Sequence, residues 1–155
     1  MKKLDSILES IAKPLAPITP WLLRLGLGTS FILHGIGKFP LPPEVMVRWF
    51  ESMGYNFPEL VTSAVAIGEV FAGAGIILGG LISGHIGNLI SRISGGAVVV
   101  IMIGALYIAH SQWFVDFLTP FEERERTQPG YKHFFYSEHM YLLILGIYFS
   151  IKGNN

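Results

Sequence analysis

Long apolar runs alternate with shorter polar stretches along this chain. Four runs are as long as a membrane-spanning helix, and they cover residues 21–38, 60–83, 93–112 and 134–151. At a rise of about 1.5 Å per residue the shortest extends about 27 Å, close to the roughly 30 Å hydrocarbon core of a bilayer. The runs are continuous and do not alternate as barrel strands do. The pattern therefore predicts an all-α integral membrane protein, a bundle of four transmembrane helices.

The residues before the first run predict a separate segment. Apolar residues recur there at helical spacing among charged ones, and they are Leu4, Ile7, Leu8 and Ile11. This pattern predicts an amphipathic helix on the membrane surface, and the prolines between residues 14 and 20 should interrupt it. The first run is too long for the apolar core of a secretory signal and contains Arg24 and His34. We therefore divide the chain into an interfacial segment, 1–20, and a four-helix membrane domain, 21–153.

The connections between the runs differ in character. Residues 39–59 are proline-rich around an amphipathic segment from Glu44 to Met53, which is expected to lie flat on the membrane. Residues 84–92 predict a short polar turn, which makes the second and third helices antiparallel neighbours. Residues 113–133 contain the charged run 122–126, which is either a solvated surface or a docking site.

Composition supports the membrane class and removes several others. The chain is 51% hydrophobic and only 14% charged, with a mean hydropathy of +0.50. Eleven basic and eleven acidic residues balance, so no attraction to nucleic acid is expected. The absence of cysteine excludes disulfides, thiolate metal sites and iron–sulfur clusters within this chain. Any redox group must therefore belong to a partner.

Orientation depends on the first helix, because basic residues divide evenly between the two sides. Three lysines precede that helix, at positions 2, 3 and 13. They favour a cytoplasmic N-terminus, and four spans then return the C-terminus to the cytoplasm.

Small residues on the second run form two ladders at four-residue spacing. The first ladder is Ala64, Gly68 and Ala72, and the second is Gly75 and Gly79. Helices in lipid associate by close packing, so these ladders predict a helix-packing surface. Its partner is either another helix of this chain or another subunit.

Seven ionisable residues interrupt the apolar runs: Arg24, His34, Lys38, Glu69, His110, Glu138 and His139. A charge near the bilayer centre costs roughly 2.5–3.5 kcal/mol on insertion scales, so these residues should pair with one another. When the helices are threaded alternately through the membrane, all except Arg24 lie nearer one surface. The three on the first helix fall within about 80° on a helical wheel and share a face.

This predicted polar cluster has more than one interpretation. In the structural one, ion pairs and hydrogen bonds fix the register of the helices. In the functional one, the cluster handles protons or binds a quinone head group. Two facing imidazoles among His34, His110 and His139 would suit a haem, but no motif supports haem or metal ligation.

Several of these stretches together resemble the DoxX family. The run from Arg24 through His34-Gly35 to Lys38 is similar to its first helix. Ala66-Ile-Gly-Glu69, followed by glycines, is similar to the second helix. Glu138 with the run ending at Lys152-Gly153 is similar to the last, so the resemblance covers about 21–153. It implies a small bacterial or archaeal protein of the cytoplasmic (inner) membrane. Some relatives are subunits of a thiosulfate:quinone oxidoreductase, and others belong to different redox or stress assemblies.

We therefore expect an integral membrane subunit of a redox complex that is not catalytic alone. Its expected partners are the lipid bilayer and either other redox subunits or further copies of itself, with quinone as the candidate ligand and no other bound cofactor. Two alternatives remain open. One is a small transporter or channel-like protein in which Glu69 and Glu138 couple transport. The other is a structural scaffold without a ligand.

Overall fold

The protein is helical throughout the residues that its structure, a computed structural model, describes, which are 2–118 and 137–154. The helices are α1 (Lys2–Ala12), the 3₁₀ helix η1 (Lys13–Ile18), α2 (Thr19–Ile36), α3 (Glu44–Ser52), α4 (Pro58–Leu81), α5 (Gly84–Ala109), α6 (Ser111–Leu118) and α8 (Glu138–Lys152). The prediction of an all-helical protein is confirmed for this part of the chain.

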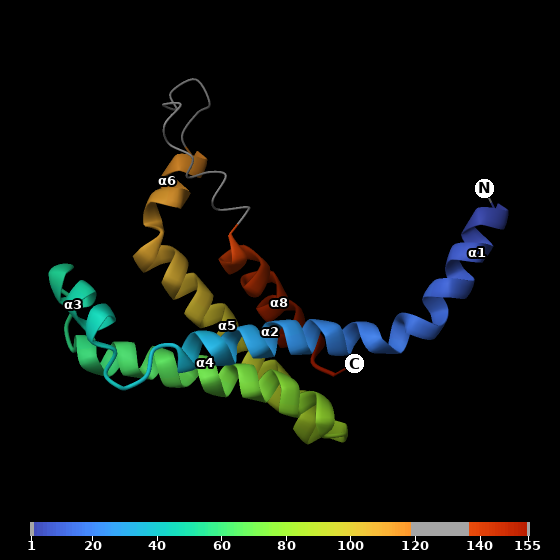
Figure 1. The fold of residues 1–155 in the computed structure, drawn as a ribbon, viewed down its shortest axis with the longest axis horizontal. Coiled ribbons are helices and arrows are strands. Elements are labelled where there is room, and N and C mark those ends of the chain that lie inside the picture. The colour runs from blue at the N-terminus through green and yellow to red at the C-terminus, as the bar shows by residue number, and fades with distance from the viewer. Residues whose placement is uncertain (1, 119–136, 155) are drawn as a thin grey trace.

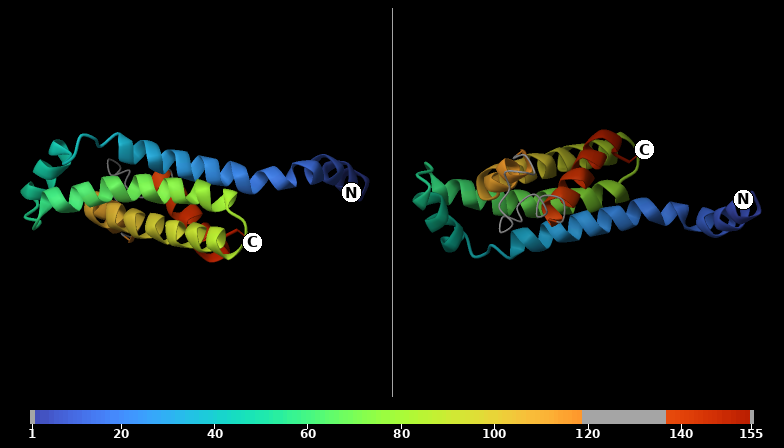
Figure 2. Two further views of the ribbon diagram at one scale, coloured as in Figure 1. Left: turned by 90° about the horizontal axis from the view of Figure 1, so that it is seen from below. Right: turned by 90° about the horizontal axis from the view of Figure 1, so that it is seen from above.

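Helices α2, α4, α5 and α8 form the bundle (Figure 1). Helix α4 packs against α2 on one side and α5 on the other, and α5 packs against α8. Figure 2 shows α8 crossing the other helices obliquely. We call the end that carries the α4–α5 turn and the end of α8 the turn end. The opposite end, which carries α3 and α6, is the α3 end (Figures 1 and 2).

Helices α4 and α5 are long and apolar enough to cross a membrane, by length and composition, and no other described helix meets that test. Helix α2 has 18 residues and includes Arg24, while α8 has 15. At about 1.5 Å per residue α8 extends only about 22 Å, less than the roughly 30 Å hydrocarbon core. The count of four spans therefore stays a prediction.

The predicted polar turn at 84–92 is wrong. Helix α5 begins at Gly84, so only Ile82 and Ser83 separate it from α4. A Cβ on Gly87 would lie 2.7 Å from Gly79 O, so the tight reversal requires glycine there. The polar residues that suggested a turn, at 85, 88 and 92, recur at helical spacing on one face of α5. The two helices are antiparallel neighbours, as expected.

The N-terminal segment projects away from the bundle at the turn end (Figure 1). The described residues of α1 are all exposed. The α-helix ends at Ala12 as the prolines predict, but the chain continues as the 3₁₀ helix η1 around Pro14 and Pro17. Pro20 lies in the first turn of α2, where a missing N–H leaves no unmade helical bond. The placement of α1 on a membrane surface stays a prediction.

Helix α3 matches the amphipathic segment predicted at 44–53. It buries Val47 and Phe50 and packs on α4 at the α3 end. Its placement flat on a membrane stays a prediction. The charged run 122–126 lies outside the described residues.

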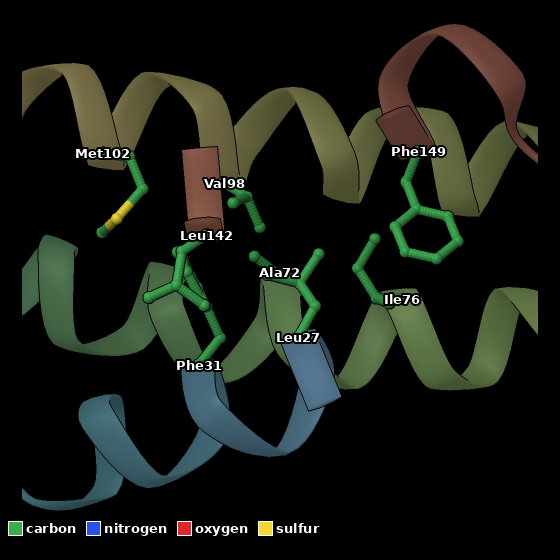
Figure 3. Packing of buried hydrophobic residues seen from close by; sticks show 8 residues of the cluster. All are labelled: Leu27, Phe31, Ala72, Ile76, Val98, Met102, Leu142 and Phe149. Atoms are coloured by element: carbon green, nitrogen blue, oxygen red, sulfur yellow. The ribbon is translucent and has the colours of Figure 1, made fainter. Parts of the chain in front are cut away.

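The apolar core takes residues from all four bundle helices (Figure 3). It comprises Leu27, Phe31, Ala72, Ile76, Val98, Met102, Leu142 and Phe149. Each is at most 7% exposed, so these side chains form the closely packed centre of the bundle.

The small residues of α4 pack mainly within this chain. Ala72 is part of the core, and Gly68, Gly75 and Gly79 face side chains of α5. Ala64 is exposed, so the first ladder does not continue to it. The side chain missing from each buried glycine lets the two helices approach closely.

Two further glycine contacts were not predicted from the ladders, because each joins glycines of two different helices and the ladders lie on one helix. A Cβ on Gly28 of α2 would lie 2.8 Å from Gly73 O of α4. A Cβ on Gly95 of α5 would lie 2.8 Å from Gly146 O of α8. Neither position has room for a side chain, so backbone-to-backbone contact sets the spacing of α2 with α4 and of α5 with α8.

Candidate functional site

The seven residues of the predicted polar cluster separate into groups at opposite ends of the bundle. Arg24 lies at the turn end, where it contacts the chain terminus. The other six lie at the α3 end, in the ion pairs and ring contacts described below. The shared helical face of Arg24, His34 and Lys38 therefore does not bring them together, because Arg24 lies about three to four helical turns before the others along the chain.

Arg24 is buried and held by four hydrogen bonds. Its Nη1 donates to Ile76 O at 2.7 Å and to Ser91 Oγ at 2.8 Å. Its Nη2 donates to Gly153 O at 3.0 Å and to Asn154 Oδ1 at 2.6 Å. The guanidinium also lies 4.7 Å from the centre of the Phe149 ring. One side chain thus joins α2, α4, α5 and the end of α8.

Asn154 was not predicted as a site residue, because no sequence motif includes it. Its Nδ2 donates to Gly79 O at 2.6 Å, and its backbone N donates to Asn88 Oδ1 at 3.0 Å. Asn154 lies two residues beyond the end of α8, and its side chain contacts α2, α4 and α5 at the turn end of the bundle. The Arg24 group, which we define as Arg24, Ser91, Gly153 and Asn154, is a packing element in which both terminal nitrogens of Arg24 donate hydrogen bonds.

Lys38 and Glu69 form the innermost pair at the α3 end. Lys38 follows the last turn of α2, and its Nζ lies 2.5 Å from Glu69 Oε2. The same Nζ donates to His34 O at 3.1 Å. Glu69 lies within α4 and is only 5% exposed. Removing one partner of such a buried pair leaves an uncompensated charge and typically lowers the free energy of unfolding by about 3–5 kcal/mol.

His34 and Glu138 form an outer pair, with Nε2 and Oε1 separated by 3.3 Å. Both side chains are largely exposed. His34 Nδ1 lies 2.9 Å from Ser30 O, which can only accept a hydrogen bond. When Nδ1 donates there, Nε2 donates to Glu138 only if the imidazole is protonated.

His110 and His139 belong to an aromatic group where α5 ends and α8 begins. The His110 ring stacks on Trp113 at 3.7 Å and meets His139 edge-on at 4.8 Å. His139 Nδ1 is buried and has no hydrogen-bond partner in the described structure. The imidazoles contact each other directly, so no haem fits between them. No group of three or more metal-binding side chains occurs among the described residues.

A cavity of about 230 Å³ lies between these groups. Its polar lining residues are His34, Lys38, Glu69 and His139. Apolar residues of α3, α4, α5 and α8 form the rest of its wall, so a few polar groups converge on an otherwise apolar space.

A larger basin of about 960 Å³ lies over residues 37–49 and Glu59. Lys38, Met46 and Trp49 line both the basin and the cavity. Lys38 is therefore the one charged side chain that borders both spaces in the described structure. The basin also has two carboxylates of its own, Glu44 and Glu59.

The contribution of α3 to this site was not anticipated from the sequence. Met46, Trp49 and Phe50 line the cavity, although the segment was expected only to lie on the membrane. The spacing of Met46, Trp49 and Phe50 by three and four residues places them on one face of α3 and was the available signal.

Comparison with known proteins places the chain in a family. No curated protein and no solved structure matches it. A family model described as DoxX matches residues 19–111, more than half of the 155 residues. The match includes α2 to α5 and both partners of the Lys38–Glu69 pair, while Glu138 and His139 lie beyond it. The chain therefore belongs to the DoxX family of membrane proteins, as its helix motifs had suggested.

Proposed function

We propose that this protein is an integral membrane subunit of a redox complex and that its cavity binds the head group of a quinone. The observation that carries the proposal is the buried Lys38–Glu69 pair in the wall of an otherwise apolar cavity. Membership of the DoxX family, whose members are often redox-related, is consistent with this role.

The size of the cavity suits a ring rather than a whole lipid. Sites for drug-sized ligands usually measure about 300–1,000 Å³, and this one measures about 230 Å³. A quinone ring fits such a space while its isoprenoid tail stays outside. The ring's carbonyl oxygens accept hydrogen bonds, and the cavity offers donors in Lys38 Nζ and the His139 ring.

Reduction of a quinone to a quinol takes up two electrons and two protons. The electrons would come from a partner subunit, because a chain without cysteine holds no iron–sulfur cluster or dithiol. The protons would come through the ionisable residues that line the cavity, Lys38 and Glu69 first. The exposed His34–Glu138 pair beside them would reload from water.

We further propose that α2, α4, α5 and α8 all cross the membrane, with both termini in the cytoplasm of a prokaryotic cell. The beginning of α2 and the end of α8 lie at the same end of the bundle, as an even number of spans requires. The α3 end, with the cavity, then faces outward. In this arrangement α1 lies in the cytoplasmic interface with Leu4, Ile7, Leu8 and Ile11 in the lipid.

The test is purification from the native membrane in a mild detergent, with mass spectrometry of copurifying proteins and extracted quinones. A stoichiometric oxidoreductase partner and bound quinone are expected. Glu69→Gln should lose the quinone but keep the partner, and Glu9→Gln, an exposed change on α1, should keep both. A quinone-free homo-oligomer would contradict the proposal.

A transport role is the second candidate, because the basin and the cavity share Lys38 in their walls and the cavity is also lined by the buried carboxylate of Glu69. Ion flux by the purified protein in liposomes, abolished by Glu69→Gln, would favour that role over the redox one.

A further inference from the structure

The spacing between α4 and α5 widens from the turn end to the α3 end. Near the turn, a Cβ on Gly79 would lie 2.9 Å from Ser91 N, and one on Gly75 would lie 3.1 Å from Ser94 Cβ. Further along, a Cβ on Gly68 would make an ordinary contact of 3.4 Å with Ile101. Beyond Ile101, a Cβ on Gly104 would meet nothing within 4 Å in the described part of the chain. The two helices are tightly packed near their turn and diverge toward the α3 end (Figure 1).

The region where they separate is the region of the cavity. Val61 and Val65 of α4 line it from one side, and Gly104 and Ile108 of α5 line it from the other. Val61 is 38% exposed, so this wall reaches the outer surface of the bundle.

The outer surface around that wall is apolar. It exposes Leu60 on α4 and Ile103 and Tyr107 on α5. In a membrane protein such a surface faces acyl chains. The side of the cavity between α4 and α5 therefore faces lipid, whereas the basin over α3 carries the charges of Lys38, Glu44 and Glu59.

The glycine at position 104 has no explanation in helix packing. Glycine is unfavourable inside a helix, and at Gly28, Gly73, Gly95 and Gly146 the close approach of a neighbouring helix accounts for it. Among residues 2–118 and 137–154, no neighbour approaches the position of a Cβ on Gly104, and its φ is not positive. Gly26 of α2 is similarly open, but it does not line the cavity. What Gly104 supplies is an open space beside the cavity.

We infer that Gly104 forms a lateral portal between α4 and α5, through which the uncharged ring of a membrane-dissolved molecule enters the cavity beside Glu69. This inference rests on the proposed function, since it specifies how a quinone reaches its site. The apolar walls favour a ring attached to a lipid tail, which stays between the acyl chains while the ring meets Lys38 and Glu69. A charged, water-soluble ligand would enter over the basin instead.

The absence of cysteine allows a direct test of access. Met102 lines the cavity and is only 5% exposed, so Met102→Cys provides a single thiol reached through the cavity. The variant is reconstituted in liposomes and its labelling rate is measured with uncharged N-ethylmaleimide and with a charged thiosulfonate, each rate being divided by the rate of the same reagent with a free thiol in solution. We expect the uncharged reagent to label it faster.

Substitutions at Gly104 then identify the route. Added to Met102→Cys, Gly104→Ala, Gly104→Leu and Gly104→Phe should slow uncharged labelling progressively, by at least tenfold for phenylalanine. Gly26→Phe is the matched control, since it adds the same bulk to an open helical glycine outside the cavity, and it should change the rate less than twofold. The graded series keeps the test valid if the phenylalanine variant folds poorly.

Equal rates in the Gly104→Phe and Gly26→Phe variants would overturn the portal, and so would faster labelling by the charged reagent. The proposed function is tested separately in the same protein by protection with a decyl-tailed benzoquinone that has no free ring position for a thiol to attack. Labelling that depends on residue 104 without protection by this quinone would reject quinone binding and keep the portal. Protection that forms equally fast with Gly104→Phe would keep quinone binding and reject the portal.

Discussion

Lys38 and Glu69 are 31 positions apart in the chain, yet Nζ of one lies 2.5 Å from Oε2 of the other. The pair joins the end of α2 to α4, and its carboxylate is buried while its ammonium borders two hollow spaces. A buried ion pair is often no more stable than an apolar replacement. The position of the pair in the cavity wall is therefore better evidence for function than its contribution to stability.

Removing only one charge of this pair should destabilise the protein strongly. Lys38→Met leaves the Glu69 carboxylate buried without its partner, so we expect a loss of about 3–5 kcal/mol in the free energy of unfolding in detergent. Lys38→Met combined with Glu69→Gln should recover most of this loss, because no buried charge remains. Denaturation of the variants in a mixed-micelle titration measures both quantities.

The control for this prediction is the exposed pair between Arg48 and Glu44 on α3, whose atoms lie 3.4 Å apart. Arg48→Met should change stability by no more than about 0.5 kcal/mol, as solvent-exposed pairs usually do. If Lys38→Met has an effect as small as Arg48→Met, the Lys38–Glu69 pair is not a structural ion pair in the membrane.

Function should respond to Glu69 more strongly than to Glu138. Glu69→Gln keeps the shape of the side chain but removes its proton exchange, so quinone reduction with the partner present should fall by at least tenfold while the protein stays folded. Glu138 is exposed, so water can replace it as a source of protons. Glu138→Gln should therefore reduce the rate of quinone reduction only about twofold. Equal effects of the two substitutions would contradict the proposed order of the proton path.

The sequence predicted an all-helical chain, but not how its ionisable residues are grouped. Hydropathy and the helix motifs located α2, α4 and α5 because these depend on local composition. Depth along the helices correctly separated Arg24 from Lys38 and Glu69, since rise per residue is fixed. The helical wheel then placed Arg24, His34 and Lys38 on a shared face, but a helical wheel does not show how far apart residues lie along the helix axis.

Other features of the structure could not be predicted from local sequence patterns. Asn154 reaches Arg24 only because α8 ends beside the α4–α5 turn, and Trp49 reaches the cavity only because α3 folds back over α4. The helical start of α5 was hidden because polar residues on one of its faces lowered the average hydropathy. Each of these features depends on contacts between segments distant in the chain.

The Arg24 group predicts that lysine does not replace arginine at position 24. The guanidinium serves four acceptors on three other segments, whereas an ammonium has three donors on a single atom and cannot span them. We expect Arg24→Lys to lower the free energy of unfolding by about 1–3 kcal/mol through unsatisfied buried acceptors. Asn154→Ala should have a smaller effect of the same sign, because it removes one of those acceptors and leaves Arg24 Nη2 with one hydrogen bond fewer.

Neither change should alter quinone affinity in the folded fraction, since the cavity lies at the other end of the bundle. A large loss of affinity in fully folded Arg24→Lys would show instead that the two ends are coupled.

The glycine contacts predict opposite effects of the same small substitution at two positions. At Gly95 an added methyl group would lie 2.5 Å from Ser150 N and 2.8 Å from Gly146 O, and backbone cannot yield as a side chain does. Gly95→Ala should therefore destabilise the bundle by about 1–3 kcal/mol, the usual range for overpacking. At Gly26 the added methyl meets nothing within 4 Å, and alanine is the better helix former, so Gly26→Ala should stabilise the protein by about 0.5–1 kcal/mol. Thermal unfolding in one detergent, followed by circular dichroism, compares the two variants directly. If Gly95→Ala proved as stable as Gly26→Ala, α5 and α8 would not be packed through their backbones at Gly95 and Gly146 in the bilayer protein.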